Sequence, residues 1–191
     1  MANKELLCDW GTIVSFEIRK ATIEDLESYT KHCVYHLTEK GIGDIFVHPF
    51  PTHHEFDFVE FSTNLKKKWT SDPFTPNWEI AWIAISDKKV VGHLNMRCGG
   101  IEALVHRMKL GMGIENGYRS LGIGTALLRS AMEWSVTQNK ISWIDLSVFE
   151  INSAARSLYK KFGFIETHTI EDALRVEDQS INDVQMTLRL R

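Results

Sequence analysis

Apolar and polar residues alternate with a period of two in the middle of the chain, which is the pattern of a β-strand with one buried face. Between residues 106 and 114, His106 and four apolar side chains occupy the even positions, whereas Arg107 and Lys109 fall on the opposite face. Two apolar runs before this strand are separated only by Asp87-Lys88-Lys89, which predicts a β-hairpin. The pattern predicts strands at residues 16–19, 78–86, 90–98, 106–114, 144–148, 164–170 and 184–190.

Four other segments carry apolar residues at the spacing of an amphipathic helix. The first begins near Thr22 and Asp25, the second near Phe58, the third at Leu121 or Gly122, and the fourth is capped by Asn152. The order of strands and helices predicts the α/β (α+β) class. We expect a mixed, mostly antiparallel central sheet of about six or seven strands, with helices on both faces.

Composition and charge fit one globular domain over residues 1–191 and exclude several function classes. The chain is 43% hydrophobic and 25% charged, and its formal net charge of -3 gives no sign of a nucleic-acid partner. Lys66-Lys67-Lys68 is typical of a solvated helix end. The three cysteines, Cys8, Cys33 and Cys98, lack the close spacing of zinc or redox sites. No apolar run has the length of a membrane span and the N-terminus does not resemble a signal peptide, so we expect a cytoplasmic protein.

The most informative segment is the glycine-led junction over residues 114–125, between the strand ending at Ile114 and the third helix. Such a junction leaves backbone N–H groups unpaired next to the positive end of the helix dipole, where they can hold a pyrophosphate. Gly122-x-Gly124 alone is weak evidence. A dinucleotide-binding loop needs a third glycine where Leu127 stands, and a Walker loop needs Gly-Lys-Ser/Thr. The junction therefore predicts a phosphorylated cofactor of another kind.

Two motifs in this half of the chain resemble those of the GCN5-related N-acetyltransferase (GNAT) family. Arg119-x-x-Gly122-x-Gly124 is followed by Asn152-x-x-Ala155-x-x-x-Tyr159-x-x-x-Gly163-Phe164, and the similarity covers residues 110–164. The resemblance implies a GNAT-like fold with a coenzyme-binding core over residues 106–164. It also implies transfer of an acetyl group from acetyl-CoA, as co-substrate and without a metal, to a primary amine of a small molecule or peptide. The alternative is a non-catalytic acyl-CoA-binding module on the same fold. A homodimer is a further expectation.

The resemblance also implies roles for individual residues. Backbone groups of Met112 and Ile114 are expected to pair with the pantetheine arm, and the N–H of Ile114 to donate to the carbonyl oxygen of the thioester. Tyr159 is expected to protonate the departing thiolate. The family more often has glycine where Ser120 stands, so Ser120 is expected to stiffen the loop if its φ is positive. The residues expected to contact the coenzyme are Met112, Gly113, Ile114, Arg119, Ser120, Leu121, Gly122, Ile123, Gly124, Thr125, Asn152 and Tyr159.

The general base is the least defined part of the expected site. His106 shares a strand face with Met112 and has a suitable unperturbed pKa of about 6.5, so it is the first candidate. Glu79, His93, Glu102 and a chain of water molecules are the alternatives. The segment 44–56 contains His48, His53, His54 and Glu55 without the spacing of a metal site, and we expect it to form a wall of the acceptor pocket instead.

Overall fold

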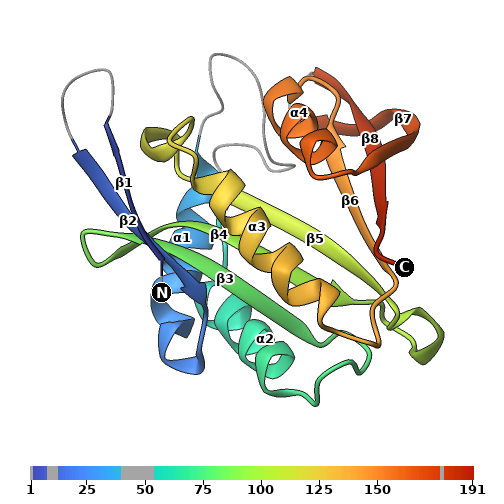
Figure 1. Ribbon diagram of the computed structural model, residues 1–191, viewed down its shortest axis with the longest axis horizontal. Helices are drawn as coiled ribbons and strands as arrows, with labels where there is room; N and C mark the ends of the chain where they lie inside the picture. Colours follow the sequence, from blue (N-terminus) through green and yellow to red (C-terminus); the bar gives the residue numbers. More distant parts are fainter. Residues whose placement is uncertain (1, 8–12, 40–53, 177–178) are drawn as a thin grey trace.

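The protein is built on one eight-stranded mixed sheet, seen in a computed structural model that describes residues 2–7, 13–39, 54–176 and 179–191 (Figure 1). The strand order is β1-β2-β3-β4-β5-β6-β8-β7, and every neighbouring pair is antiparallel except β5 and β6. The strands are β1 (Ala2–Leu7), β2 (Ile13–Lys20), β3 (Glu79–Ser86), β4 (Lys89–Cys98), β5 (Arg107–Ile114), β6 (Trp143–Phe149), β7 (Ile165–Val176) and β8 (Gln179–Arg189).

Four α-helices cover the two faces of the sheet. Helices α1 (Leu26–Thr38) and α2 (Phe58–Thr70) pack against β3 and β4 on one face, whereas α3 (Ile123–Val136) lies across β2 to β5 on the other. Helix α4 (Ser153–Lys161) follows β6 and lies beside β7 and β8 (Figure 1). None of the helices in the described ranges is long and apolar enough to cross a membrane.

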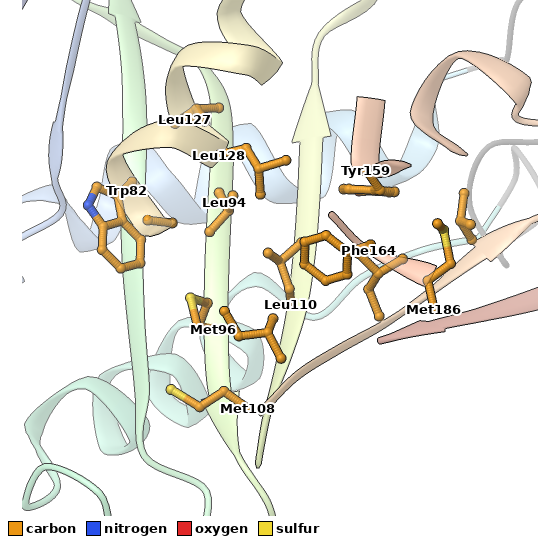
Figure 2. Close-up of a cluster of buried hydrophobic side chains, with 14 of the residues drawn as sticks. Trp82, Leu94, Met96, Met108, Leu110, Leu127, Leu128, Tyr159, Phe164 and Met186 are labelled. Atoms are coloured by element: carbon orange, nitrogen blue, oxygen red, sulfur yellow. The ribbon is translucent and has the colours of Figure 1, made fainter. Parts of the chain in front are cut away.

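Alternate residues of β3 and β4 belong to two separate hydrophobic clusters, as their period of two requires. On the α3 face, Trp82 and Leu94 pack with Leu127, and this larger cluster continues past Leu110 to Tyr159 beside β6 and β8 (Figure 2). On the α1–α2 face, a smaller cluster contains Tyr29, Cys33, Leu65, Ala81, Ile83 and Val90.

Strands β5 and β6 pair only at their beginnings, over Arg107↔Trp143 to Lys109↔Asp145. Strand β5 continues to Ile114 and β6 to Phe149 without further pairing to each other. Each remains bound to its outer neighbour, β4 or β8, so the sheet opens as a wedge between them. The second half of β5 therefore presents one edge of its backbone to a gap inside the sheet.

The structure confirms the α/β class, the mostly antiparallel mixed sheet and the helices on both faces. It adds one strand, because Ala2–Leu7 pairs with β2 in a segment where the sequence has no clear alternation. The last hairpin is also longer than predicted. Val176 and Ile181 are buried and belong to β7 and β8, beyond the predicted strand ranges 164–170 and 184–190, and residues 177–178 lie outside the described residues.

Candidate functional site

The start of α3 has the geometry of an anion-binding site. Ser120 and Gly122 both have positive φ, 62° and 75°, so the chain bends sharply just before the helix. The first intrahelical bond runs from the N–H of Ala126 to the C=O of Gly122, at 3.0 Å, and no side chain caps the helix. The N–H groups of residues 123–125 thus have no partner within the helix. Ser120 keeps the left-handed bend that the family more often builds with glycine.

The open edge of β5 is formed by its even-numbered residues. The N–H of Glu115 donates to the C=O of Val91 on β4, at 3.0 Å. In an antiparallel pair the hydrogen-bonding direction alternates along the strand, so Gly113 also faces β4 while Met112 and Ile114 face the gap. The N–H and C=O of Met112 and the N–H of Ile114 thus offer an edge for strand-like pairing with an extended ligand, whereas the C=O of Ile114 accepts from Arg119.

A cavity of about 1290 Å³ occupies the gap, and we call it the gap cavity. Its walls come from β5 over residues 110–114, the loop before α3, the first turns of α3, the end of β6, and α4. Leu121 and Ile123 do not line it with their side chains, and Ile123 is fully buried in the core. Ten of the expected contact residues do: Met112, Gly113, Ile114, Arg119, Ser120, Gly122, Gly124, Thr125, Asn152 and Tyr159.

Arg119 is held firmly at the mouth of the gap cavity. Its Nε donates to the C=O of Ile114 at 3.0 Å, and its Nη2 lies 3.2 Å from Oε2 of Glu39. The Glu39 carboxylate also accepts from the N–H of Asn116 at 3.0 Å, which ties the end of α1 to the loop. The Nη1 atom of Arg119 is buried without a hydrogen-bond partner among the described residues. A buried cationic donor without a partner suits an anionic ligand.

Two exposed cations of the gap cavity were missed by the sequence analysis. Arg129 projects from the second turn of α3, and Lys161 ends α4. Arg129 stands seven residues after Gly122, which is two helical turns, so its position on the same helix face was available from the spacing. Both place positive charge beside the gap cavity, which suits an anionic ligand.

Tyr159 joins the gap cavity to the hydrophobic core. Its side chain is 6% exposed, and its ring centroid lies 5.8 Å from that of Phe164 (Figure 2). Burial raises the pKa of the phenol above its usual value near 10, so the hydroxyl stays protonated at neutral pH. Asn152 accepts a hydrogen bond from the N–H of Ala155 at 3.1 Å, so it is the N-cap of α4 and also lines the cavity.

A second cavity of about 450 Å³, which we call the side chamber, lies on the α1–α2 face of the sheet. Residues of α1, α2, β3 and β4 line it, together with Met112 of β5. His36 and Met112 line both cavities, so the two spaces adjoin at the open part of β5. Glu79 lies in the side chamber with its carboxylate 3.9 Å from Nζ of Lys68, and burial raises the pKa of this carboxyl.

Three histidines converge between the side chamber and β5. His93 on β4 lies 2.9 Å from His32 on α1, measured between Nδ1 and Nε2, and lines the chamber. Nδ1 of His32 lies 3.1 Å from the Glu115 carboxylate, whose other oxygen is 2.6 Å from Nζ of Lys89. Gly113 makes room for this cluster, because a Cβ there would lie 2.5 to 2.7 Å from the rings of His36 and His93. His32 and His36 belong to no motif that the sequence showed, although their spacing of four residues places them on one helix face.

The remaining candidates lie elsewhere. His106 is exposed just before β5, at the end of the strand far from the glycine loop, and lines neither cavity; Glu102 is likewise exposed. His48 and His53 fall outside the described residues, whereas His54 and Glu55 are exposed ahead of α2. No group of three or more His, Cys, Asp or Glu side chains in the described part of the chain is arranged to hold a metal ion.

The two described cysteines are buried free thiols of low reactivity, and Cys8 lies outside the described residues. Cys33 lines the side chamber, and burial raises its pKa well above the usual range of a thiol. Burial also raises the pKa of Cys98, to about 11. Neither thiol supplies a thiolate nucleophile at neutral pH.

Acidification from about pH 7 to about pH 5.5 is expected to lower the melting temperature through His32 and His93. Burial lowers the pKa of both rings below the usual value of about 6.5. Below about pH 6.5 the unfolded chain then binds more protons than the folded one. The contribution of the two neutral rings to the free energy of unfolding is therefore complete above about pH 6.5 and is lost as the pH falls. We expect Tm to fall by roughly 3 °C or more in calorimetry. Replacing both rings by glutamine should flatten this slope, and an unchanged slope would contradict the assignment.

Comparison with known proteins agrees with the geometry. A model of the acetyltransferase (GNAT) domain matches residues 77–166. The Drosophila melanogaster protein "Probable N-acetyltransferase san" is 29% identical over 149 residues, which cover 78% of this chain and 80% of that protein. A GNAT-family acetyltransferase from Streptococcus pneumoniae superimposes with a TM-score of 0.76 at 22% identity, over 91% of this chain and 98% of that one. The protein yncA from Salmonella typhimurium, solved with its cofactor acetyl-CoA, gives a TM-score of 0.72 at 13% identity, over 92% and 94%.

The family model falls on the part of the chain that contains β3 to β6, the glycine loop and α4. The solved structures share the fold over nine-tenths of the chain. The sequence motifs, the strand topology and the relatives all indicate the same family. The chain belongs to the GCN5-related N-acetyltransferase (GNAT) family and is an acetyl-CoA-dependent N-acetyltransferase.

Proposed function

We propose that this enzyme acetylates a primary amine of a small molecule or peptide by direct attack of the amine on acetyl-CoA within a ternary complex. The observation that carries the proposal is the meeting of two cavities at Met112 and His36, one on each side of the open β5 edge. One cavity offers an anion site and a strand edge, and the other offers a polar chamber. Two substrates entering from opposite faces would meet without a covalent enzyme intermediate.

The residues of the gap cavity fit a diphosphate-bearing, extended ligand. The N–H groups of residues 123–125 and the orphaned Nη1 of Arg119 are donors for the diphosphate. The backbone of Met112 and Ile114 suits the amide-containing pantetheine arm. The gap between β5 and β6 leads from this loop toward Tyr159, so the acyl end would lie near the phenol.

Three groups of this chain would then serve the reaction. Acetyl-CoA, when bound, supplies the activated acyl group. The Met112 N–H faces the gap where the cavities meet and would donate to the carbonyl oxygen, with the Ile114 N–H, expected for this role from the sequence, one strand repeat away. Tyr159 would protonate the departing sulfur. His93 would take the proton of the incoming ammonium, because it lines the side chamber and pairs in register with Gly113.

Glu79 is less well placed than His93 for the role of base. Glu79 on β3 lies opposite Arg97 of β4 in the sheet register, and Arg97 lies four residues beyond His93, at the end of β4 away from the glycine loop. Together with Lys68 and Arg97 it makes the inner wall of the chamber polar and charged. A volume of about 450 Å³ suits a small amine or the terminal residue of a peptide. The cytoplasmic location and the homodimer stay predictions.

The test is a transfer assay that is run beside a binding measurement. Calorimetry gives the dissociation constant of acetyl-CoA, and mass spectrometry detects acetylated products from a panel of amino acids, polyamines, aryl-alkylamines and peptides with free N-termini. We expect coenzyme binding and acetylation of at least one amine class. Tight coenzyme binding without transfer to any amine would reject the proposal in favour of an acyl-CoA-binding module.

A further inference from the structure

A line of hydrogen-bonded side chains runs from the side chamber to the molecular surface. His93 contacts His32, His32 contacts Glu115, and Glu115 contacts Lys89, with distances of 2.9, 3.1 and 2.6 Å. The side chains of His32 and Glu115 are 1% and 5% exposed, whereas that of Lys89 is 58% exposed. These groups come from α1, β4 and the residue that follows β5, so the line depends on the packing of three separate elements.

The chemistry of the line fixes where the protons lie. An ionised carboxylate is an acceptor only, so His32 must donate to Glu115 from Nδ1–H. In the neutral ring Nε2 of His32 is then an acceptor, and His93 must donate to it from its own Nδ1–H. The second nitrogen of His93, Nε2, is left with a free lone pair. Lys89 is consistent with this order of protons, because its ammonium donates to the other oxygen of the Glu115 carboxylate at 2.6 Å.

We propose that Glu115 and His32 are positioning residues that hold His93 in its Nδ1–H tautomer, so that Nε2 of His93 accepts the proton that the acceptor amine must lose. The inference deepens the proposed function and rests on it. Glu115 directly follows Ile114 and precedes the glycine loop, so the same residue that orients His32 also lies at the start of this loop. Through Glu115 the base and the coenzyme loop are held by the same short segment.

Two protons leave the acceptor ammonium during the reaction. One N–H bond of the acceptor ammonium breaks, a bond to Nε2 of His93 forms, and the lone pair released on the amine attacks the thioester carbon. The imidazolium keeps its Nδ1–H bond to His32, and the Glu115 carboxylate compensates the positive charge through His32. When the C–S bond breaks, Tyr159 protonates the sulfur. The nitrogen of the acetylated product still carries a second excess proton, which passes to the Tyr159 phenolate, directly or through water, and restores the phenol. After the product leaves, His93 releases its proton to solvent, so one proton is released per turnover.

The other groups around His93 are consistent with a neutral ring in the resting enzyme. His32 and His36 face it from α1, with ring centroids 5.1 and 6.1 Å away, and Tyr29 lies edge-on at 5.3 Å. Burial and these two histidines lower the pKa of His93 well below its usual value. The lone pair on Nε2 is therefore free at neutral pH, while the Glu115 carboxylate makes protonation less costly than burial alone would.

The direct test is nuclear magnetic resonance on the intact protein with ¹⁵N-labelled histidine. Long-range ¹H–¹⁵N correlation distinguishes the two neutral tautomers, and the variants His93→Gln and His32→Gln assign the signals. We expect both His32 and His93 as the Nδ1–H form at about pH 7.5, although the Nε2–H form is the common one in solution. An Nε2–H tautomer at His93 would overturn the proposal. This measurement needs neither a known acceptor nor a folded Glu115 variant.

The kinetic test uses Glu115→Gln, with Glu27→Gln as the matched control. Glu27 lies on α1 with its side chain 73% exposed, so its loss should change nothing. Removing the Glu115 charge destabilises the imidazolium of His93, so the acidic limb of kcat/KM should move to lower pH by roughly one pH unit. The plateau should fall about tenfold while the dissociation constant of acetyl-CoA changes less than twofold. A purely structural role would lower Tm and leave the acidic limb in place.

The two levels of proposal fail separately. If no amine is acetylated, the proposed function fails while the tautomers can still be observed. If an amine is acetylated but the acidic limb persists unchanged in His93→Gln, the base lies elsewhere and the present inference is rejected alone. In His93→Gln we expect the acidic limb of kcat/KM to disappear and the rate to fall about a hundredfold. The control is His168→Gln, because His168 is exposed.

Discussion

Replacing Gly124 by valine is expected to weaken acetyl-CoA binding at least about a hundredfold. A Cβ at this position already lies 3.2 Å from Cδ1 of Ile114 and 3.2 Å from Cδ2 of Leu158, so a branched side chain has no room beside the core. Its two methyl groups are expected to extend into the gap cavity, over the N–H groups that we propose bind the diphosphate. Because those donors act only at close backbone approach, the substitution removes the site while leaving the helix in place.

The measurement is isothermal titration calorimetry with acetyl-CoA, and the matched control is Gly117→Ala. Gly117 belongs to the same loop, but a Cβ there meets no atom within 4 Å, so its dissociation constant should stay within about twofold of wild type. Circular dichroism and Tm establish that the Gly124 variant is folded. A folded Gly124→Val protein that binds acetyl-CoA with unchanged affinity would place the diphosphate elsewhere.

Replacing Tyr159 by phenylalanine is expected to slow acetyl transfer between about a hundredfold and ten-thousandfold, the range of a lost general acid. The ring and its contact with Phe164 are kept, so packing and coenzyme affinity should change little. Burial raises the pKa of the Tyr159 phenol, so wild-type enzyme should show no basic limb from this group below about pH 10. The effect should fall on kcat rather than on the dissociation constant of acetyl-CoA.

For Tyr159→Phe, single-turnover kinetics measures the rate of acetyl transfer and calorimetry measures the dissociation constant of acetyl-CoA. Tyr35→Phe is the control, since Tyr35 is 53% exposed on α1 and its ring contact with Lys89 survives the loss of the hydroxyl. A leaving group with a lower pKa, such as a thiophenol ester, should restore part of the lost rate. An unaltered rate in Tyr159→Phe would remove the phenol from the mechanism and leave protonation of the sulfur to water.

The geometry of the loop proposed to bind the coenzyme was largely predictable from the sequence because it is local. Residues 119–125 carry the bend, the uncapped helix start and the backbone donors within seven consecutive positions. The period of two in β5 similarly indicates that Met112 and Ile114 share a direction along the strand. What the pattern did not show is that β6 departs from β5 after Lys109, which turns that shared direction into an open edge.

The base was the least predictable part, because a strand pattern gives the face of a residue but not what lies against that face. His106 shared a favourable face with Met112 in the sequence, yet it is exposed at the opposite end of β5. His93 is 61 residues from His32, and His32 is 83 residues from Glu115. Their meeting depends on the register of β4 against β5 and on the docking of α1, neither of which is encoded within any short segment.

The sequence by itself determined most of the secondary structure elements, the two-sided sheet and the glycine-led loop before α3, because each depends on local backbone preferences and on the burial of apolar faces. The tertiary structure alone decided that two cavities adjoin at Met112 and that a histidine pair backed by Glu115 lies beside them. The physical reason is that hydrogen bonds between side chains act over about 3 Å. Only the packing of α1 on the sheet brings such distant residues within that distance.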